Sequence, residues 1–235
     1  MLAIFKREVR AYFYSPIAYV LIGFFIVLSS IFFLLGNLGY QSADFNSNLS
    51  TMGFLLLFIV PILTMRSIAE DRKNGTEVLL VTSPVGLSGI VVGKYLAAFF
   101  VFLVMTVITF IYPIILFIFG SPALPALVGG YVGFILLGAA FISVGVFVSS
   151  LTENQVVAAV ASFVFLLVTW IIQPLAGYVG GIGAKVLNWF SLTSRYDNFN
   201  RGIFELDPVV YYISFVAVFL FLTIRVMEKR RWSQG

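Results

Sequence analysis

The feature that most constrains this chain is a stretch of 58 residues, from 95 to 152, that contains no Asp, Glu, Lys or Arg. A soluble fold needs a charged surface, yet only 10% of this 235-residue chain is charged and 61% is hydrophobic. Typical soluble domains have about 25% charged and about 45–50% apolar residues. Disorder is excluded, because disordered chains are poor in apolar residues. The composition therefore predicts a membrane protein that crosses the bilayer several times.

Six charge-free apolar runs predict an all-α membrane protein with six transmembrane helices in a single domain covering residues 1–235. The spans are expected at about 16–36, 50–66, 89–119, 126–149, 155–173 and 208–225. The long uncharged stretch divides at residues 120–125, where Gly-Ser-Pro-Ala-Leu-Pro is a strong turn signal, and Pro174 ends the fifth span. Pro61 and Pro113 are expected to bend their helices. Continuous apolar runs favour helices over a β-barrel, whose strands alternate.

The distribution of basic residues predicts the orientation of the spans. With the N-terminus in the cytoplasm, 11 of the 14 Lys and Arg residues fall in cytoplasmic segments, and only Lys185, Arg195 and Arg201 fall outside. Cytoplasmic loops carry the excess of Lys and Arg in membrane proteins. We therefore expect both termini on the cytoplasmic side.

Several classes of function are excluded by residues that the chain lacks. Cys and His are both absent, so zinc sites, disulfides and Cys/His nucleophilic pairs cannot form. The apolar centres of the spans carry no ionisable residue, which argues against an intramembrane hydrolase and a proton-coupled carrier. Residues 89–94 resemble a phosphate-binding loop, but the glycine spacing is wrong and Tyr95 replaces Ser or Thr. We expect no bound cofactor, no nucleic acid, and glycines that serve helix packing here and at Gly129 and Gly133.

Residues 2–14 form the pattern of an amphipathic helix at the cytoplasmic membrane interface. One face carries Leu2, Phe5, Val9, Tyr12 and Phe13, and the basic residues Lys6, Arg7 and Arg10 lie elsewhere. Such a helix binds membrane lipid through its apolar face and anionic head groups through its bases. Two interpretations stay open: a topology anchor and an element that transmits force.

The cytoplasmic segment 70–84 is the most informative connection. The second span is expected to continue as a helix through Lys73, Gly75 suits a left-handed cap, and Thr76 can cap a new short helix with Glu77 in its first turn. That helix is apolar at residues 78–81, including Leu79 and Leu80, and the pair Ser83-Pro84 ends it. Four apolar residues facing the cytosol need a partner. They predict either a second membrane anchor or a docking surface for another subunit.

Two further connections carry patterns of their own. Thr152 and Gln155 have capping-box spacing in the cytoplasmic turn that also contains Glu153 and Asn154, and structural capping is the favoured interpretation. The external segment 174–207 is rich in glycine and aromatic residues. It is expected to dip back into the outer leaflet, as a gate or lid or as an aromatic interfacial cap.

Taken together, several stretches along the whole chain resemble ABC-2 type transporter permeases, with most similarity to the gliding-motility permease group. These stretches are 5–8 (FKRE) with 14–17 (YSPI), Pro61 with 64–67 (TMRS), 70–77 (EDRKNGTE) with Leu79, Leu80 and 82–84 (TSP), 93–95 (GKY), 151–156 (LTENQV), and 201–203 (RGI) with Asp207 and Tyr211. The segment 70–84 is the most specific of them, because it combines cap, helix and stop in the order of the family.

The resemblance implies a half-transporter of the bacterial inner membrane that pairs with a second or related permease and with two ATPase subunits, which hold ATP and Mg. It implies that the segment after Gly75 is a coupling helix and that the coupling residues are Glu70, Asp71, Arg72, Gly75, Thr76, Glu77, Leu79, Leu80, Thr82, Ser83 and Pro84. An exporter is the favoured function. A non-transporting subunit that couples ATP hydrolysis to an external machine, and a membrane scaffold, remain alternatives.

Overall fold

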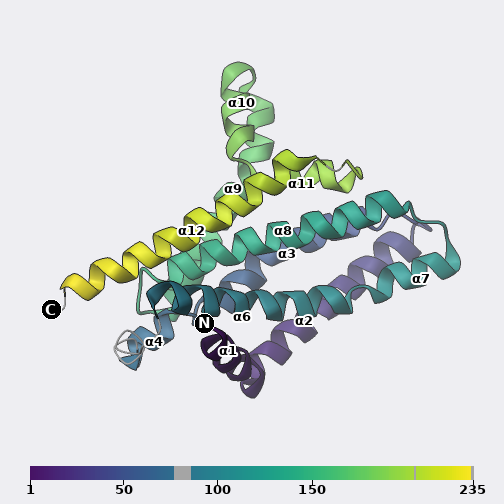
Figure 1. The fold of residues 1–235 in the computed structure, drawn as a ribbon. Helices are drawn as coiled ribbons and strands as arrows, with labels where there is room; N and C mark the ends of the chain where they lie inside the picture. Colours follow the sequence, from purple (N-terminus) through teal and green to yellow (C-terminus); the bar gives the residue numbers. More distant parts are fainter. Residues whose placement is uncertain (77–85, 204, 234–235) are drawn as a thin grey trace.

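The computed structural model of the chain describes residues 1–76, 86–203 and 205–233, drawn in colour in Figure 1. These residues form helices and no strand. The helices are α1 (Leu2–Tyr14), α2 (Pro16–Phe32) with the π-helix η1 (Phe33–Leu38), α3 (Asn46–Thr64), α4 (Ala69–Lys73), α6 (Leu87–Ile108), α7 (Ile111–Phe119), α8 (Leu124–Ser149), α9 (Gln155–Val179), α10 (Gly181–Phe190), α11 (Leu192–Asn200) and α12 (Leu206–Ser233). Within this part of the chain, six segments are long and apolar enough to cross a membrane. The predicted all-α membrane fold is confirmed.

Helix α8 forms the centre of the bundle and packs against α3, α6, α9, α11 and α12. Small residues allow this packing, because a glycine lets a neighbouring helix approach its backbone closely. A Cβ atom added to Gly138 would lie 2.3 Å from the Phe102 ring of α6, and one added to Gly133 would lie 2.7 Å from Cβ of Phe199 on α11. Gly129 likewise faces α11. The packing role predicted for Gly129 and Gly133 is confirmed.

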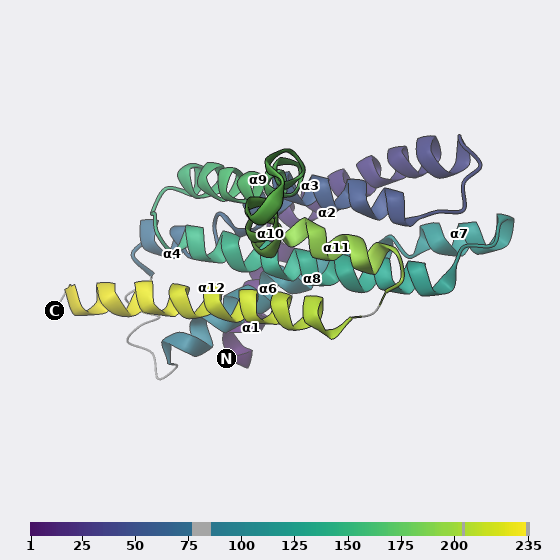
Figure 2. The same cartoon turned by 90° about the horizontal axis from the view of Figure 1, so that it is seen from above.

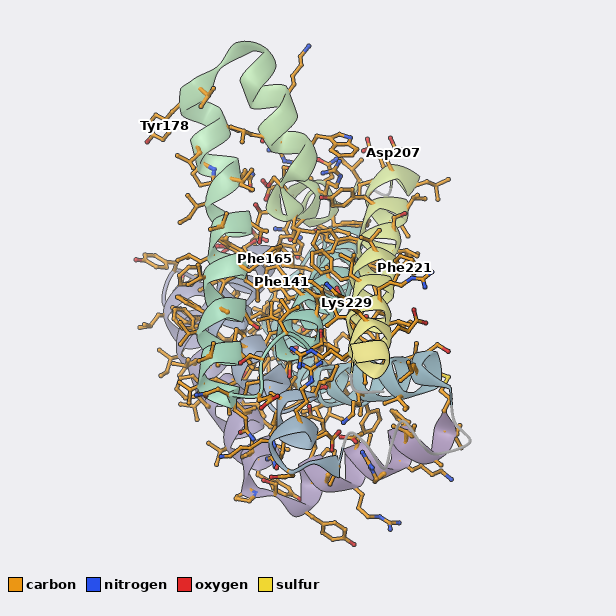
Figure 3. The ribbon with its side chains drawn as sticks, turned by 90° about the vertical axis from the view of Figure 1, so that its left-hand side faces the viewer. Phe141, Phe165, Tyr178, Asp207, Phe221 and Lys229 are labelled. Carbon is orange, nitrogen blue, oxygen red and sulfur yellow. The ribbon has the colours of Figure 1, made fainter. Side chains whose placement is uncertain are left out.

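The bundle has two distinct ends, which Figures 1 and 2 show on the left and on the right. Both termini and α4 lie toward the left end. The last turn of α8 belongs there too, since Ser149 contacts the start of α4, as does the end of α12, where Arg230 donates to the Leu151 carbonyl oxygen at 3.0 Å. The link between α2 and α3 lies at the opposite end with the link between α7 and α8. Two of the three connections predicted to be external are thus separated from those predicted to be cytoplasmic by the length of the bundle. The third, with Tyr178 and Asp207 near its two ends, lies on the upper side of the bundle in Figure 3.

Four helix boundaries differ from those predicted. The second span does not continue as one helix through Lys73, because α3 ends at Thr64 and a turn at residues 65–68 separates it from α4. Helix α9 continues through Pro174 to Val179, because a proline inside a membrane helix is tolerated where neighbouring groups satisfy the freed carbonyl. Helix α12 runs past 225 to Ser233. The third span is broken into α6 and α7 at Thr109 and Phe110, just before Pro113, which lacks the N–H that an unbroken helix requires.

The segment after α9 folds back in two helices with different environments. Gly180 turns the chain with a positive φ of 66°, a conformation that glycine adopts without steric cost. Helix α10 packs on α9 and projects from the bundle at the top of Figure 1. Helix α11 instead buries Leu192, Tyr196 and Phe199 and lies against α8. Its dip into the outer leaflet remains a prediction.

Candidate functional site

The site begins at a corner in the chain between α3 and α4, at residues 65–68. Because the helix is interrupted there, its carbonyl groups lose their usual partners. Three side chains from other helices replace them: Tyr12 donates to the Leu63 oxygen at 2.9 Å, Ser149 to the Met65 oxygen at 3.0 Å and Lys94 to the Ser67 oxygen at 2.6 Å. Helices α1, α8 and α6 therefore meet at this one corner.

Ser149 also fixes the start of α4. Its hydroxyl oxygen accepts hydrogen bonds from the backbone N–H groups of Ile68 and Ala69, both at 3.1 Å. These are amides at the N-terminus of a helix, which have no partner within the helix itself. Ile68, Ala69 and Ser149 are all buried. The end of the central helix α8 thus sets where α4 begins and which way it points.

Four charged side chains lie beside this corner, and we call them the ionic junction: the buried Lys94, the partly buried Glu8 and Asp71, and Arg7, which is 49% exposed. The Nζ atom of Lys94 lies 3.0 Å from Oε1 of Glu8 and 2.5 Å from Oδ2 of Asp71. Arg7 pairs with Glu8 and lies 3.9 Å from Asp71. The Lys94 side chain is only 3% exposed. Helices α1, α4 and α6 are therefore joined through one ammonium group.

The electrostatics of the ionic junction explain why its members belong together. A charge removed from water carries a large desolvation cost that only close opposite charges and hydrogen bonds offset. Two cations and two anions balance here, and removal of Lys94, whose side chain is 3% exposed, would leave the Glu8 and Asp71 carboxylates, which are 14% and 18% exposed, without this cation. Burial raises the pKa of the neighbouring Tyr12 phenol, and the Glu8 carboxylate raises it further. Tyr12 therefore stays protonated and remains a hydrogen-bond donor to the corner.

The predicted coupling residues that the structure describes lie on or just after α4. Glu70 forms a bidentate ion pair with Arg66, with N–O distances of 2.8 and 3.1 Å, and Arg72 is buried. Gly75 has a φ of 68°, and its N–H donates to the Arg72 oxygen at 3.0 Å. The left-handed cap predicted at Gly75 is confirmed.

Thr76 follows Gly75 in the coupling segment, and its hydroxyl donates a hydrogen bond to Oδ1 of Asp71, earlier in the chain, at 2.8 Å. The remaining predicted coupling residues, Glu77, Leu79, Leu80, Thr82, Ser83 and Pro84, lie outside the described residues, and with them the short helix predicted there.

The apolar face predicted for α1 needs correction. The residues that α1 buries most deeply are Ile4 and Tyr12, whereas Leu2 is 67% exposed. Ile4 packs against α6, where a Cβ added to Gly93 would lie 3.0 Å from it, which confirms a packing role for Gly93. Phe5 contacts the Phe100 ring edge-on, with centroids 6.0 Å apart.

The predicted face was wrong because it was chosen from the apolar residues alone. Glu8, one turn after Ile4, lies on the same inward-facing stripe of α1 as Ile4. Lys6, Arg7 and Arg10 are exposed, as expected for residues at a membrane surface.

The turn between α8 and α9 also needs correction. The residue that caps α9 is Asn154, whose side-chain oxygen accepts from the N–H groups of Val156 and Val157. Thr152 instead accepts from the Asn154 N–H at 3.2 Å, and Gln155 is the first residue of the helix. Capping is the correct interpretation, but the cap lies two residues later, because the Thr152 hydroxyl forms a local turn. Glu153 is exposed.

Sequence reasoning missed the residues that hold the site together: Lys94, Glu8, Ser149 and Tyr12. Lys94 had a usable signal, because it is the last charge before 58 uncharged residues. Ser149 had none, since a serine at the end of an apolar helix is common. Arranged in this way, the residues can hold three helices in a fixed relation beside a loop; among the described residues no cluster suited to a metal ion occurs.

The family model described as "ABC-2 family transporter protein" matches residues 36–226, which include α4, α6 and the segment between them but not α1. A search of curated proteins gives no match.

Proposed function

The chain belongs to the ABC-2 transporter family, and we propose that it is the permease subunit of an exporter driven by a separate ATPase. The observation that carries this proposal is the ionic junction. It ties three helices to the base of the segment 70–84, so a displacement of that segment has a direct physical route into the membrane bundle. The chain's own residues supply the binding surface and the moving helices, and ATP and Mg belong to the partner.

The proposed orientation places the end with α1 and α4 in the cytoplasm. Ten basic residues at this end, namely Lys6, Arg7, Arg10, Arg66, Arg72, Lys73, Lys94, Arg225, Lys229 and Arg230, precede or follow apolar spans. Lys185, Arg195 and Arg201 belong to the segments after α9. The excess of positive charge on one side supports this orientation, with the membrane a bacterial inner membrane.

The proposed mechanism starts when two ATPase subunits close on ATP and press on the segment 70–84 of two permease copies. The corner at residues 65–68 separates α4 from α3, so α4 can tilt without bending the long span. Its tilt reaches α1 and α6 through Lys94 and reaches α8 through Ser149. Movement of α8, which packs against five other helices, changes the bundle and exposes the substrate path to the outside.

The test replaces the two leucines expected to face the ATPase. Leu79→Ala with Leu80→Ala should leave membrane insertion intact, because no span is altered, and should weaken docking about tenfold or more, since burying a leucine is worth about 1.5–3 kcal/mol. Co-purification of the ATPase, and ATP hydrolysis coupled to transport in reconstituted vesicles, measure the effect.

A matched control removes two leucines at the opposite end. Leu34 and Leu35 are exposed in η1, and Leu34→Ala with Leu35→Ala should leave association with the ATPase unchanged. If the variant at 79 and 80 keeps full association and coupled activity, the segment is only a membrane anchor and the coupling role is wrong.

A further inference from the structure

We propose that Lys94 is a positioning residue that clamps the base of the loop between α4 and α6, so that α1, α4 and α6 keep one fixed arrangement when the loop is pushed. This inference rests on the proposed coupling function and deepens it, because it names the group that transmits a force on the loop to α1 and α6. A clamp differs from an ordinary stabilising ion pair in that its loss frees the helices while leaving them folded.

The first observation is that the ion pair between Asp71 and Lys94 closes the loop. Asp71 lies on α4, before the loop, and Lys94 lies in α6, after it, yet the two charged atoms are 2.5 Å apart. Without such a contact the chain segments that enter and leave the loop could separate. A force on the loop would then move these segments apart instead of moving the helices of the bundle. With it, both ends of the loop move together.

The second observation is that the two carboxylate oxygens of Asp71 contact different partners. Oδ2 pairs with Lys94, while Oδ1 accepts a hydrogen bond from the Thr76 hydroxyl at 2.8 Å. Thr76 is the last residue described before the predicted coupling helix. A chain of contacts thus runs from Thr76 through Asp71 and Lys94 to Glu8 of α1, and a contiguous network of this kind can carry energetic coupling.

The third observation is the fit of the ammonium group. Lysine has three N–H donors and no acceptor. Nζ of Lys94 donates to Oε1 of Glu8 at 3.0 Å and to the Ser67 carbonyl oxygen at 2.6 Å, and it forms an ion pair with Oδ2 of Asp71 at 2.5 Å. One compact charge thus contacts three segments. The planar fork of an arginine cannot reproduce this compact arrangement. The site is therefore shaped for one point charge.

Two ion pairs outside the ionic junction lack these properties. Arg225 and Glu228 are one turn apart on α12, and their side chains are 61% and 36% exposed. Arg66 and Glu70 are also close in sequence. These pairs join residues that the backbone already holds together, whereas Lys94 joins segments that are far apart in sequence.

The experiment measures the two contacts separately in the purified full-length chain, which has no natural cysteine. For α1, the pair Ile4→Cys and Gly93→Cys should form a disulfide quickly under mild oxidation, because Cβ of Ile4 lies 3.2 Å from the position of a Cβ at Gly93. For α4, Ala69→Cys is buried and should resist N-ethylmaleimide.

In each background Lys94→Met should slow the cross-link, or speed the labelling, about tenfold or more, since the loss of a buried charge partner has effects of this size. Arg225→Met is the matched control and should change either rate less than about twofold, because exposed pairs contribute little.

A second variant separates a clamp from mere stabilisation. Lys94→Met combined with Glu8→Gln and Asp71→Asn leaves no buried charge unpaired in the ionic junction, since the remaining Arg7 is 49% exposed. This variant should fold and melt like the natural chain, yet α1 and α4 should remain loose in both assays. Natural rates in this triple variant would overturn the proposal, as would natural rates in Lys94→Met. Lys94→Arg should also remain loose, and natural rates there would contradict the shape of the site. These assays need no ATPase, so their failure is distinguishable from failure of the proposed coupling at Leu79 and Leu80.

Discussion

The two ends of the bundle are both held by buried polar side chains, but of different kinds. The ionic junction uses charges: Lys94 meets Glu8 and Asp71. At the opposite end the side chains are neutral amides. Asn46 donates from its one amino group to the Ala126 oxygen at 2.8 Å and to the Asn200 oxygen at 2.6 Å, which joins α3 to the start of α8 and to the end of α11.

This opposite end, which we call the amide end, contains further hydrogen bonds donated by asparagine side chains. Asn37 donates to the Ser42 and Asp44 oxygens at 3.0 and 2.9 Å, and Asn200 donates to the Ser50 hydroxyl at 2.7 Å. Each partner is a fixed backbone group or a short side chain. Neutral hydrogen bonds of this kind are weaker than charge-assisted ones and depend strongly on geometry.

The difference teaches how each end is expected to respond to change. Charges act over several ångströms, so the ionic junction can stay intact while its helices tilt together. Amide hydrogen bonds weaken steeply when donor and acceptor move out of line. The amide end therefore suits a fixed frame, and the ionic end suits a group of helices that moves as one unit.

The largest expected effect comes from placing a charge in the amide end. Asn46→Asp replaces a donor with a carboxylate that faces two carbonyl oxygens, and a buried charge without a partner costs about 3–5 kcal/mol. The free energy of unfolding in detergent should fall by about that amount. Asn46→Ala, which only removes the two hydrogen bonds, should cost less, about 1–3 kcal/mol. Equal losses in the two variants would show that this end does not discriminate against charge.

The second effect compares the close approach of α8 at each end. A Cβ at Gly129 would lie 2.4 Å from the Phe199 carbonyl oxygen, whereas one at Gly145 would lie 2.1 Å from the Thr64 hydroxyl. Gly129→Ala and Gly145→Ala should each cost about 1–3 kcal/mol through overpacking. Thr64→Ala should rescue Gly145→Ala in part, because it removes the hydroxyl at 2.1 Å but keeps the Thr64 Cβ at 2.8 Å. No side-chain change can move the carbonyl that blocks Gly129→Ala.

Thermal melts of the single and double variants measure this, with Gly23→Ala as the control, since nothing lies within 4 Å of a Cβ there. A failure of Thr64→Ala to rescue would mean that Gly145 is restricted by the backbone as well.

A smaller effect is expected from the hydroxyl that caps α4. Ser149→Ala leaves the N–H groups of Ile68 and Ala69 without their acceptor and should cost about 1–2 kcal/mol, as for the loss of other helix caps. Amide hydrogen exchange at residues 68 and 69 should rise, while exchange in the middle of α8 should stay slow. Unchanged exchange at 68 and 69 would show that water replaces the serine and that α8 does not fix α4.

The smallest effect should come from an exposed ion pair. Glu228→Gln removes the partner of Arg225 on α12, whose contact of 2.8 Å is open to solvent. Exposed pairs contribute about 0–1 kcal/mol, so the melting temperature should hardly change. A loss as large as that of Ser149→Ala would mean that charge at the surface matters as much as burial, and the contrast between the two ends would lose its basis.

The sequence determined the class of fold and the helices that cross the membrane. Runs of apolar residues are a local property, and in a bilayer a backbone without water must form its own hydrogen bonds, so these runs predict helices without knowledge of their neighbours. The left-handed turn at Gly75 followed for the same reason, since it depends on one residue and the helix before it.

Only the tertiary structure decided which helix is central and which polar residues meet. Lys94, Glu8 and Asp71 lie far apart in the chain, and no periodic pattern links them. Ile4, not Leu2, faces α6 because Gly93 leaves room for it there. Asn154, not Thr152, caps α9 because the Thr152 hydroxyl accepts from the Asn154 N–H in a local turn, while the Asn154 side chain accepts from the Val156 N–H of the helix. Contacts of this kind arise from how helices pack against each other, and a sequence records each helix but not its partner.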